Sequence, residues 1–189
     1  MMTAPLKLVI LDRDGVINYD SDHFIKTPAE WKPIPGSIEA IARLNQSGFR
    51  GVVATNQSGI GRGLFDMATL NAINDKMMEQ VFRAGGRIDA IFFCPCTAEQ
   101  HCHCRKPDTG MFEDIAARYQ MGLNGMPSIG DSQRDLEAAA KSGCVPLLVL
   151  TGKGKKTRDK GDLPRGTRVF ADLAAAADAL VAESVRAPA

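Results

Sequence analysis

The chain has few aromatic residues, almost no net charge and no long apolar run. Aromatic residues make up 6% of the 189 positions, and the formal net charge is +1. A near-neutral balance without an aromatic-basic groove pattern argues against a dedicated nucleic-acid surface. No apolar run approaches the length of a membrane span, and the first seven residues lack the apolar core of a signal peptide. We therefore expect a cytoplasmic protein with neither a nucleic-acid nor a membrane partner.

The length and the cysteine content set two further expectations. A chain of 189 residues without an internal repeat or a dividing linker suits a single domain, 1–189, with a full hydrophobic core. Five cysteines are present, and four of them lie between positions 94 and 104. In a reducing compartment such cysteines are more often metal ligands or free thiols than disulfides.

Short apolar runs alternate with amphipathic stretches along the chain. Strands are expected near 8–11, 50–55, 90–93, 127–129 and 145–150. Helices are expected near 37–46, 68–83, from 110 onward, 134–142 and 172–185. We interpret 16–33 as a long functional loop, 59–63 as a flexible glycine-rich loop and 153–156 as a solvated basic loop. The alternation predicts an α/β fold, a three-layer, doubly wound and mostly parallel sheet with right-handed crossovers.

The first apolar run ends in two carboxylates one residue apart. Asp12 and Asp14 follow Leu11 directly, and Gly15 then permits a sharp turn. Open α/β sheets build their sites at the carboxyl ends of such strands. Two clustered carboxylates repel each other unless a cation lies between them, which points to a hard metal such as Mg²⁺. From these residues alone, a turn with two solvated acids is an equal alternative.

The other expected strands also end in polar groups. Thr55 closes the second strand, Arg105 and Lys106 follow the cysteine-rich segment, and Asp131 ends the fourth strand. A carboxylate that attacks phosphorus, a second that protonates the leaving oxygen, and cations that neutralise the phosphoryl oxygens are the requirements of phosphoryl transfer. An exposed basic pair and an ordinary strand-end hydroxyl are the simpler interpretations of these residues.

The cysteine-rich loop, 94–104, is a candidate metal site. Four thiolates satisfy tetrahedral zinc and leave no open position, so such a site would be structural. The candidate ligands are Cys94, Cys96, Cys102 and Cys104. Their spacing is tighter than the usual two-residue gap, and free thiols are the alternative. Cys144 precedes an apolar strand and is interpreted as core packing.

Four short motifs, taken in order, resemble those of the haloacid dehalogenase superfamily of phosphatases. They are Asp12-x-Asp14-Gly15, Thr55, Lys106-Pro107 and Gly130-Asp131. More narrowly, the stretches 11–18, 55–59 and 102–107 are similar to the heptose 1,7-bisphosphate 7-phosphatase family, and the histidinol-phosphate phosphatases share these motifs. The likeness extends from about position 8 to the final helix. It implies the superfamily fold without a separate cap domain, and the zinc loop after the third strand.

The resemblance also implies a role for each motif residue. Asp12 would be the nucleophile and would form an aspartyl-phosphate, and Asp14 would act as general acid and then as base. Thr55 and Lys106 would hold the transferring phosphoryl group. Mg²⁺ would bind Asp12, the backbone carbonyl of Asp14, and Asp131.

Substrate contacts are implied at eight positions. These are Arg13, Asp20, His23, Asn56, Gln57, Ser58, Arg105 and Ser132. Arg105 suits a second phosphate or a cluster of sugar hydroxyls. The fourth motif lacks the adjacent second acid of many superfamily members; Asp135 could supply it, or could cap or pair within its helix.

The implied activity is removal of the 7-phosphate from a heptose bisphosphate by a monomeric enzyme, in the synthesis of nucleotide-activated heptose for lipopolysaccharide. Histidinol-phosphate hydrolysis and a non-catalytic zinc module are the competing hypotheses. The heptose enzymes carry a structural zinc loop here, and many have histidine where this chain has Cys96. His101 or His103 could therefore replace one of the cysteine ligands.

Overall fold

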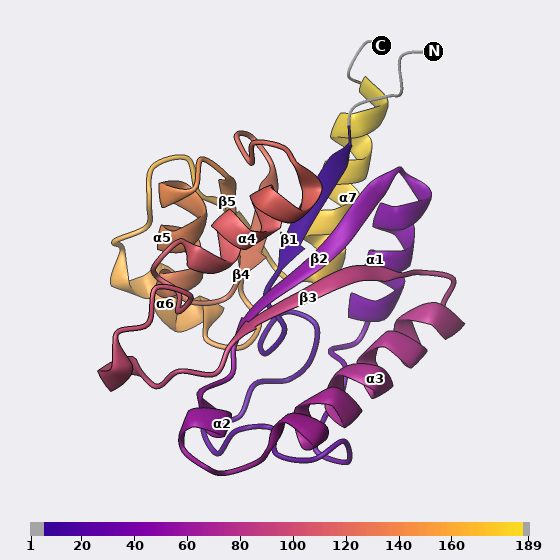
Figure 1. Ribbon diagram of the computed structural model, residues 1–189. Helices are drawn as coiled ribbons and strands as arrows, with labels where there is room; N and C mark the ends of the chain where they lie inside the picture. The colour runs from indigo at the N-terminus through magenta and orange to yellow at the C-terminus, as the bar shows by residue number, and fades with distance from the viewer. Residues whose placement is uncertain (1–5, 187–189) are drawn as a thin grey trace.

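The computed structural model describes residues 6–186, and within them a six-stranded sheet lies between two layers of helices (Figure 1). The strands are β1 (Lys7–Leu11), β2 (Phe49–Asn56), β3 (Ile88–Cys94), β4 (Pro127–Gly130), β5 (Val145–Val149) and β6 (Arg168–Phe170). The helices are α1 (Ser37–Gln46), α2 (Ser58–Gly61), α3 (Met67–Arg83), α4 (Gly110–Tyr119), α5 (Gln133–Lys141), α6 (Gly154–Lys160) and α7 (Leu173–Arg186), with a 3-10 turn at Ala98–Gln100.

The sheet has the order β3-β2-β1-β4-β5-β6, and every pairing is parallel. Helices α1, α3 and α7 lie on one side of the sheet, and α4, α5 and α6 on the other (Figure 1). The doubly wound parallel fold predicted from the alternation is thus confirmed. The order reverses at β1, whose neighbours β2 and β4 lead to opposite edges of the sheet, so the crevice at its carboxyl end is the expected position of a site.

The apolar run of β1 is explained by burial on both of its faces. Val9 and Leu11 pack in the core that contains α1, α3 and α7, whereas Leu8 and Ile10 pack with α4 and α5. Each of these four side chains is at most 1% exposed. A strand with two covered faces has no polar alternation, which is why the sequence shows a continuous apolar run there.

The long segment after β1 is an ordered loop that is pinned to the helices. Trp31 is fully buried in the core, and Lys76 of α3 donates hydrogen bonds to the carbonyls of Pro28 (2.6 Å) and Trp31 (2.9 Å). Ser37, at the start of α1, donates to the carbonyl of Ile17 at 2.6 Å. These bonds hold the loop beside the carboxyl end of the sheet.

Three short elements were not predicted from the sequence. The basic segment 153–156 is not a loop: it enters the helix α6, whose Thr157 hydroxyl donates to the carbonyl of Asp131. The glycine-rich segment contains α2, and β6 adds a three-residue edge strand. Each of these elements is too short to show helical or strand periodicity, and each is stabilised by contacts with the rest of the fold.

Among the described residues, no helix combines the length and the apolar character that crossing a bilayer requires. Residues 1–5, which carried most of the inference about a signal peptide, lie outside the described residues.

Candidate active site

The polar ends of three neighbouring strands meet at one edge of the sheet. Asp12 follows β1, Thr55 lies at the end of β2, and Asp131 follows β4; all three are almost fully buried. They line a cavity of about 250 Å³. The parallel pairing of these strands brings together residues that lie far apart in the sequence, as the motif order indicated.

Lys106 enters this cavity from the loop between β3 and α4. Its Nζ lies 3.1 Å from Asp12 Oδ1 and 2.7 Å from Asp135 Oδ1, and it donates a hydrogen bond to the carbonyl of Ala54 at 2.7 Å. Burial alone would lower the pKa of Lys106, but the two carboxylates raise it above its usual value. Lys106 therefore carries a fixed positive charge beside Asp12.

The carboxylates of Asp12, Asp131 and Asp135 form a compact acidic cluster, with one oxygen of each lying within 4.8 Å of the others. Burial and the charges of nearby acids raise the pKa of Asp12 to about 6, although the charge of Lys106 acts in the opposite direction. Burial and the negative charges of Asp135 and Asp12 raise the pKa of Asp131 to about 8. The cluster thus has more negative charge than its one lysine offsets. Buried, hard oxygen donors with unbalanced negative charge fit a divalent cation such as Mg²⁺.

The Asp131 carboxylate is held by a tight backbone cradle. Its Oδ2 accepts a hydrogen bond from the backbone N–H of Lys153 at 2.7 Å. A Cβ at Gly15 or at Gly152 would collide with this carboxylate, and Gly15 has a φ of 89°. Glycine at these two positions therefore allows the loops after β1 and β5 to approach Asp131.

Asp14 lies beside the cluster but faces a different set of partners. Its carboxylate accepts hydrogen bonds from Arg13 (3.0 and 3.2 Å), Asn18 (2.8 Å) and Gln57 (2.8 Å). Burial would raise the pKa of Asp14, but the Arg13 charge and these hydrogen bonds lower it below its usual value. The side chain of Asp14 is therefore ionised at neutral pH.

Asp135 caps its helix, one of the alternatives that the sequence left open, but its ion pair lies outside that helix, and it also belongs to the acidic cluster. Its Oδ2 accepts from the backbone N–H (3.0 Å) and the hydroxyl (2.5 Å) of Ser132, which forms the capping box of α5. Its other oxygen pairs with Lys106. Asp135 thus ties the start of α5 to the lysine.

The cavity contains most of the predicted site residues. Its lining includes Asp12, Asp14, Asp20, Thr55, Asn56, Gln57, Ser58, Arg105, Lys106 and Asp131. Three predicted substrate contacts are not part of this lining: Arg13 is fully buried and supports Asp14, His23 is exposed outside the cavity, and the Ser132 hydroxyl is directed to Asp135.

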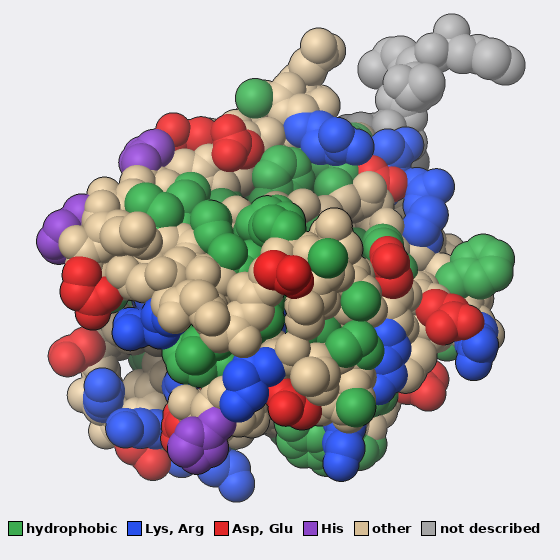
Figure 2. Space-filling model, turned by 60° about the horizontal axis from the view of Figure 1, so that its bottom comes forward, with side chains coloured by type: hydrophobic (Ala, Val, Ile, Leu, Met, Phe, Trp, Pro, Cys, Tyr) green, Lys and Arg blue, Asp and Glu red, His purple; other side chains and the backbone are tan. Residues whose placement is uncertain are grey.

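Seven residues of the lining were not predicted as site residues: Ser21, Asp22, Phe24, Ile25, Arg62, Arg134 and Lys153. Lys153, which we interpreted as part of a solvated loop, lies 3.1 Å from Asp20 and 3.8 Å from Asp22. Its position just after the carboxyl end of β5 was the available signal. Figure 2, which turns this end of the molecule forward, shows basic side chains around a hollow in the surface.

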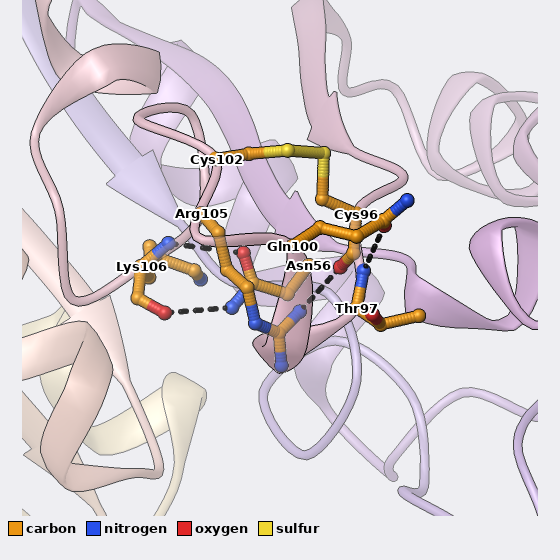
Figure 3. The surroundings of a disulfide bond; sticks show 7 residues. All are labelled: Asn56, Cys96, Thr97, Gln100, Cys102, Arg105 and Lys106. Carbon is orange, nitrogen blue, oxygen red and sulfur yellow. Dashed lines mark hydrogen bonds between the residues drawn. A yellow bond between two sulfur atoms is a disulfide. The ribbon is translucent and has the colours of Figure 1, made fainter.

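The cysteine-rich loop differs from the expectation that its cysteines are metal ligands or free thiols and form no disulfide. Cys96 and Cys102 form a disulfide with a Cα–Cα distance of 6.2 Å (Figure 3). The expectation is wrong for this pair because the loop folds back and brings the two side chains together. The sulfur atoms of Cys94, Cys96 and Cys104 lie within 4.8 Å of one another, so all four cysteines belong to one cluster. Soft sulfur donors in such a cluster fit zinc once the disulfide is reduced.

The two histidines of this loop are placed differently from the cysteines. Both His101 and His103 are exposed, and neither belongs to the metal-binding groups found among residues 6–186. The Nε2 of His103 lies 2.9 Å from Glu113 Oε2, and this hydrogen bond raises the pKa of His103. The structure therefore gives no support to a histidine ligand in place of a cysteine.

The loop is fastened to the edge of the sheet that lines the cavity (Figure 3). Asn56 and Lys106 exchange two hydrogen bonds of 3.1 Å, one in each direction between the Asn56 side chain and the Lys106 backbone. Arg105 donates from Nη1 to the carbonyl of Cys96 at 2.9 Å. The conformation of the cysteine-rich loop thus sets the positions of Arg105 and Lys106.

Comparison with known proteins identifies the family. The HAD-hydrolase-like family model matches residues 103–176. The D-glycero-beta-D-manno-heptose-1,7-bisphosphate 7-phosphatase of Bordetella bronchiseptica is 58% identical over 95% of this chain and 100% of its own length. The enzyme of the same name from Pseudomonas putida is 52% identical over 93% of this chain and 100% of its own length.

Solved structures agree with this assignment. The D,D-heptose 1,7-bisphosphate phosphatase of B. bronchiseptica, in complex with magnesium and phosphate, superposes with a TM-score of 0.93 at 58% identity, covering 94% of this chain and 99% of that one. The enzyme from Burkholderia thailandensis gives a TM-score of 0.75 at 54% identity, covering 93% and 98%. The chain belongs to the D-glycero-beta-D-manno-heptose-1,7-bisphosphate 7-phosphatase family of HAD-like hydrolases.

Proposed function

We propose that this protein is a Mg²⁺-dependent phosphatase that removes the 7-phosphate of D-glycero-beta-D-manno-heptose 1,7-bisphosphate and leaves heptose 1-phosphate. The observation that carries the proposal is the buried contact between Asp12 and Lys106 beside the acidic cluster, at the carboxyl end of β1. In this proposal a nucleophile, a fixed cation and metal-binding oxygens surround one cavity. The names of the relatives supply the substrate.

Asp12 acts as the nucleophile in this proposal. One of its carboxylate oxygens forms a bond to phosphorus while the bond between phosphorus and the sugar O7 breaks, which gives an aspartyl-phosphate. Lys106 and Thr55 hold the phosphoryl oxygens, and the charge of Lys106 also favours the ionised form of Asp12. Water then attacks phosphorus, the aspartyl-phosphate is cleaved, and Asp12 is regenerated with release of inorganic phosphate.

Asp14 moves the protons in both steps. It gives a proton to the leaving O7 and takes one from the attacking water. Its pKa is low in the free protein because of Arg13, Asn18 and Gln57. The negative charge of a bound phosphoryl group acts in the opposite direction and favours protonation of Asp14 when substrate is present.

Two metal ions fit the residues. Asp12, Asp131 and the backbone carbonyl of Asp14 would hold Mg²⁺, which when bound neutralises phosphoryl charge. The four thiolates of the cysteine-rich loop (Cys94, Cys96, Cys102 and Cys104) would hold a structural zinc in the reduced protein. A zinc-ordered loop would fix the backbone that carries Arg105 and Lys106.

Four cations of the cavity lining, which we call the basic rim, favour a substrate with a second phosphate: Arg62, Arg105, Arg134 and Lys153. We assign the remote phosphate to Arg105 because a guanidinium binds phosphate through two parallel hydrogen bonds. A basic rim disfavours the cationic amine of histidinol phosphate. We further propose that the enzyme is a cytoplasmic monomer with one domain and no cap, and that it serves the synthesis of nucleotide-activated heptose for lipopolysaccharide.

Phosphate release tests the proposal directly. The wild-type protein should release one phosphate per heptose 1,7-bisphosphate in the presence of Mg²⁺, and Asp12→Asn should release none because an amide cannot attack phosphorus. A matched control is Asp178→Asn, which removes an exposed carboxylate on α7 and should retain full activity. Turnover by Asp12→Asn would refute the assigned nucleophile.

A further inference from the structure

The cations of the cavity differ in whether a carboxylate offsets their charge. Lys106 pairs with Asp12 and Asp135, Lys153 pairs with Asp20, and Arg62 lies 3.8 Å from Glu99. Within the described part of the chain, neither Arg105 nor Arg134 has a carboxylate at ion-pair distance. The lining thus includes two guanidinium groups whose charge no acid neutralises.

These two arginines line the same cavity. Both side chains are only partly exposed. Two like charges in a partly desolvated cavity are unfavourable unless an anion binds between them.

Arg134 also has an unused donor. Its Nε is buried and has no hydrogen-bond partner among the residues that the structure describes. No nitrogen of the Arg134 guanidinium makes a hydrogen bond to the described residues, so its terminal nitrogens are available to a ligand in the cavity that Arg134 lines. Arg105 differs, because its Nη1 is fixed by the carbonyl of Cys96 and its other nitrogens make no hydrogen bond to the described residues.

We propose that Arg134 binds the non-reacting phosphate of the substrate together with Arg105, so that a phosphate dianion lies between the two guanidinium groups. The proposal rests on the proposed function and adds to it a residue of α5 that no motif indicated. The dianion supplies terminal oxygens for the guanidinium donors of Arg134 and for the free donors of Arg105. It also removes the repulsion between the arginines.

A different role for Arg134 has to be distinguished. Its charge also lowers the pKa of Asp12, although by less than Lys106 does. A purely electrostatic effect on Asp12 would change the hydrolysis of every phosphate ester to the same extent. A contact with the remote phosphate changes only substrates that carry one, so two sugars that differ in that group separate the two roles.

The experiment compares heptose 1,7-bisphosphate with heptose 7-phosphate, which keeps the reacting group and lacks the other phosphate. For Arg134→Gln, the ratio of kcat/KM between the bisphosphate and the monophosphate should fall by about 20-fold, mainly through KM, as expected for the loss of charge-assisted hydrogen bonds. Arg134→Lys, which keeps the charge and loses the planar fork, should give an intermediate ratio. The control Lys156→Gln removes an exposed cation of α6 that is outside the cavity lining, and should keep the wild-type ratio.

An unchanged ratio in Arg134→Gln would overturn the inference, whether both substrates lose activity equally or neither does. A wild-type protein that hydrolyses neither sugar would instead refute the proposed function, so the two failures are distinguishable. Thermal denaturation of each variant shows whether the fold is retained, and Arg134→Lys keeps the test valid if the glutamine variant is unstable.

Discussion

Magnesium binding should depend steeply on pH, because the acidic cluster holds protons when no cation is bound. The pKa of Asp131 is raised to about 8 and that of Asp12 to about 6, chiefly by burial and by neighbouring carboxylates. A carboxylate has to lose its proton before it can ligate a metal ion. Below pH 8, binding of Mg²⁺ should therefore release about one proton, which comes mainly from Asp131.

The size of the effect follows from this proton. A single released proton weakens binding about tenfold for each pH unit below the pKa, or about 1.4 kcal/mol per unit. Between pH 8 and pH 6 the dissociation constant for Mg²⁺ should thus rise about 100-fold, and more steeply near pH 6 where Asp12 also takes up a proton. Above pH 8 the affinity should level off.

The same shifts predict how the metal-free protein responds to pH. Both acids titrate near 3.8 when the chain is unfolded, so from pH 4 to pH 8 the folded chain holds more protons than the unfolded chain. Stability should consequently fall as pH rises through this window, by about 1.4 kcal/mol per unit for each such proton. Asp14 and Asp135 have lowered pKa values, are ionised in both states above pH 5, and add no slope there.

Isothermal titration calorimetry measures both quantities. Titrations with Mg²⁺ at pH 6, 7 and 8, each in two buffers of different ionisation enthalpy, give the affinity and the number of protons released. Asp178→Asn, which changes an exposed acid of α7, should behave as the wild type. An affinity that is constant between pH 6 and pH 8, or binding without proton release, would refute the electrostatic account of the cluster.

Two further predictions concern stability and zinc. Asp135→Asn leaves the Lys106 ammonium with one buried partner fewer and should lower the free energy of unfolding by about 3 kcal/mol in urea titrations. The control Asp178→Asn breaks an exposed ion pair and should lower the free energy of unfolding by well under ~1 kcal/mol. Equal losses in the two variants would contradict the role of Asp135. In reducing buffer the protein should bind about one zinc per chain by elemental analysis, and Cys94→Ser should reduce this content. The control Cys144→Ser lies outside the loop and should retain the full zinc content. A Cys94→Ser protein with full zinc content would refute the four-thiolate site.

The sequence allowed us to predict the helices and strands that show a clear hydrophobic pattern, and the site residues that directly follow a strand. The two-faced burial of β1 leaves a continuous apolar run, and the amphipathic patterns of α1, α3, α5 and α7 mark those helices closely. The polar residues at the ends of β1, β2 and β4 converge because parallel strands place their carboxyl ends at one edge. For these residues, local pattern and tertiary position agree.

The remaining features depend on contacts between distant segments. Arg134 lies one residue into α5, where an arginine ordinarily faces solvent, and only its position at the cavity distinguishes it. Lys153 precedes a helix too short to be recognised, and its pairing with Asp20 joins loops that lie far apart in the sequence. The Cys96–Cys102 bond likewise depends on how the loop folds back, which residue spacing does not determine.

The most direct test of the central claim is the release of phosphate, with Mg²⁺ present, from heptose 1,7-bisphosphate and from histidinol phosphate under the same conditions. The buried Asp12–Lys106 contact predicts that phosphate is released, and the basic rim around Arg105 predicts that kcat/KM favours the bisphosphate by at least a hundredfold. A preference for histidinol phosphate would contradict the assignment of the second phosphate to the basic rim.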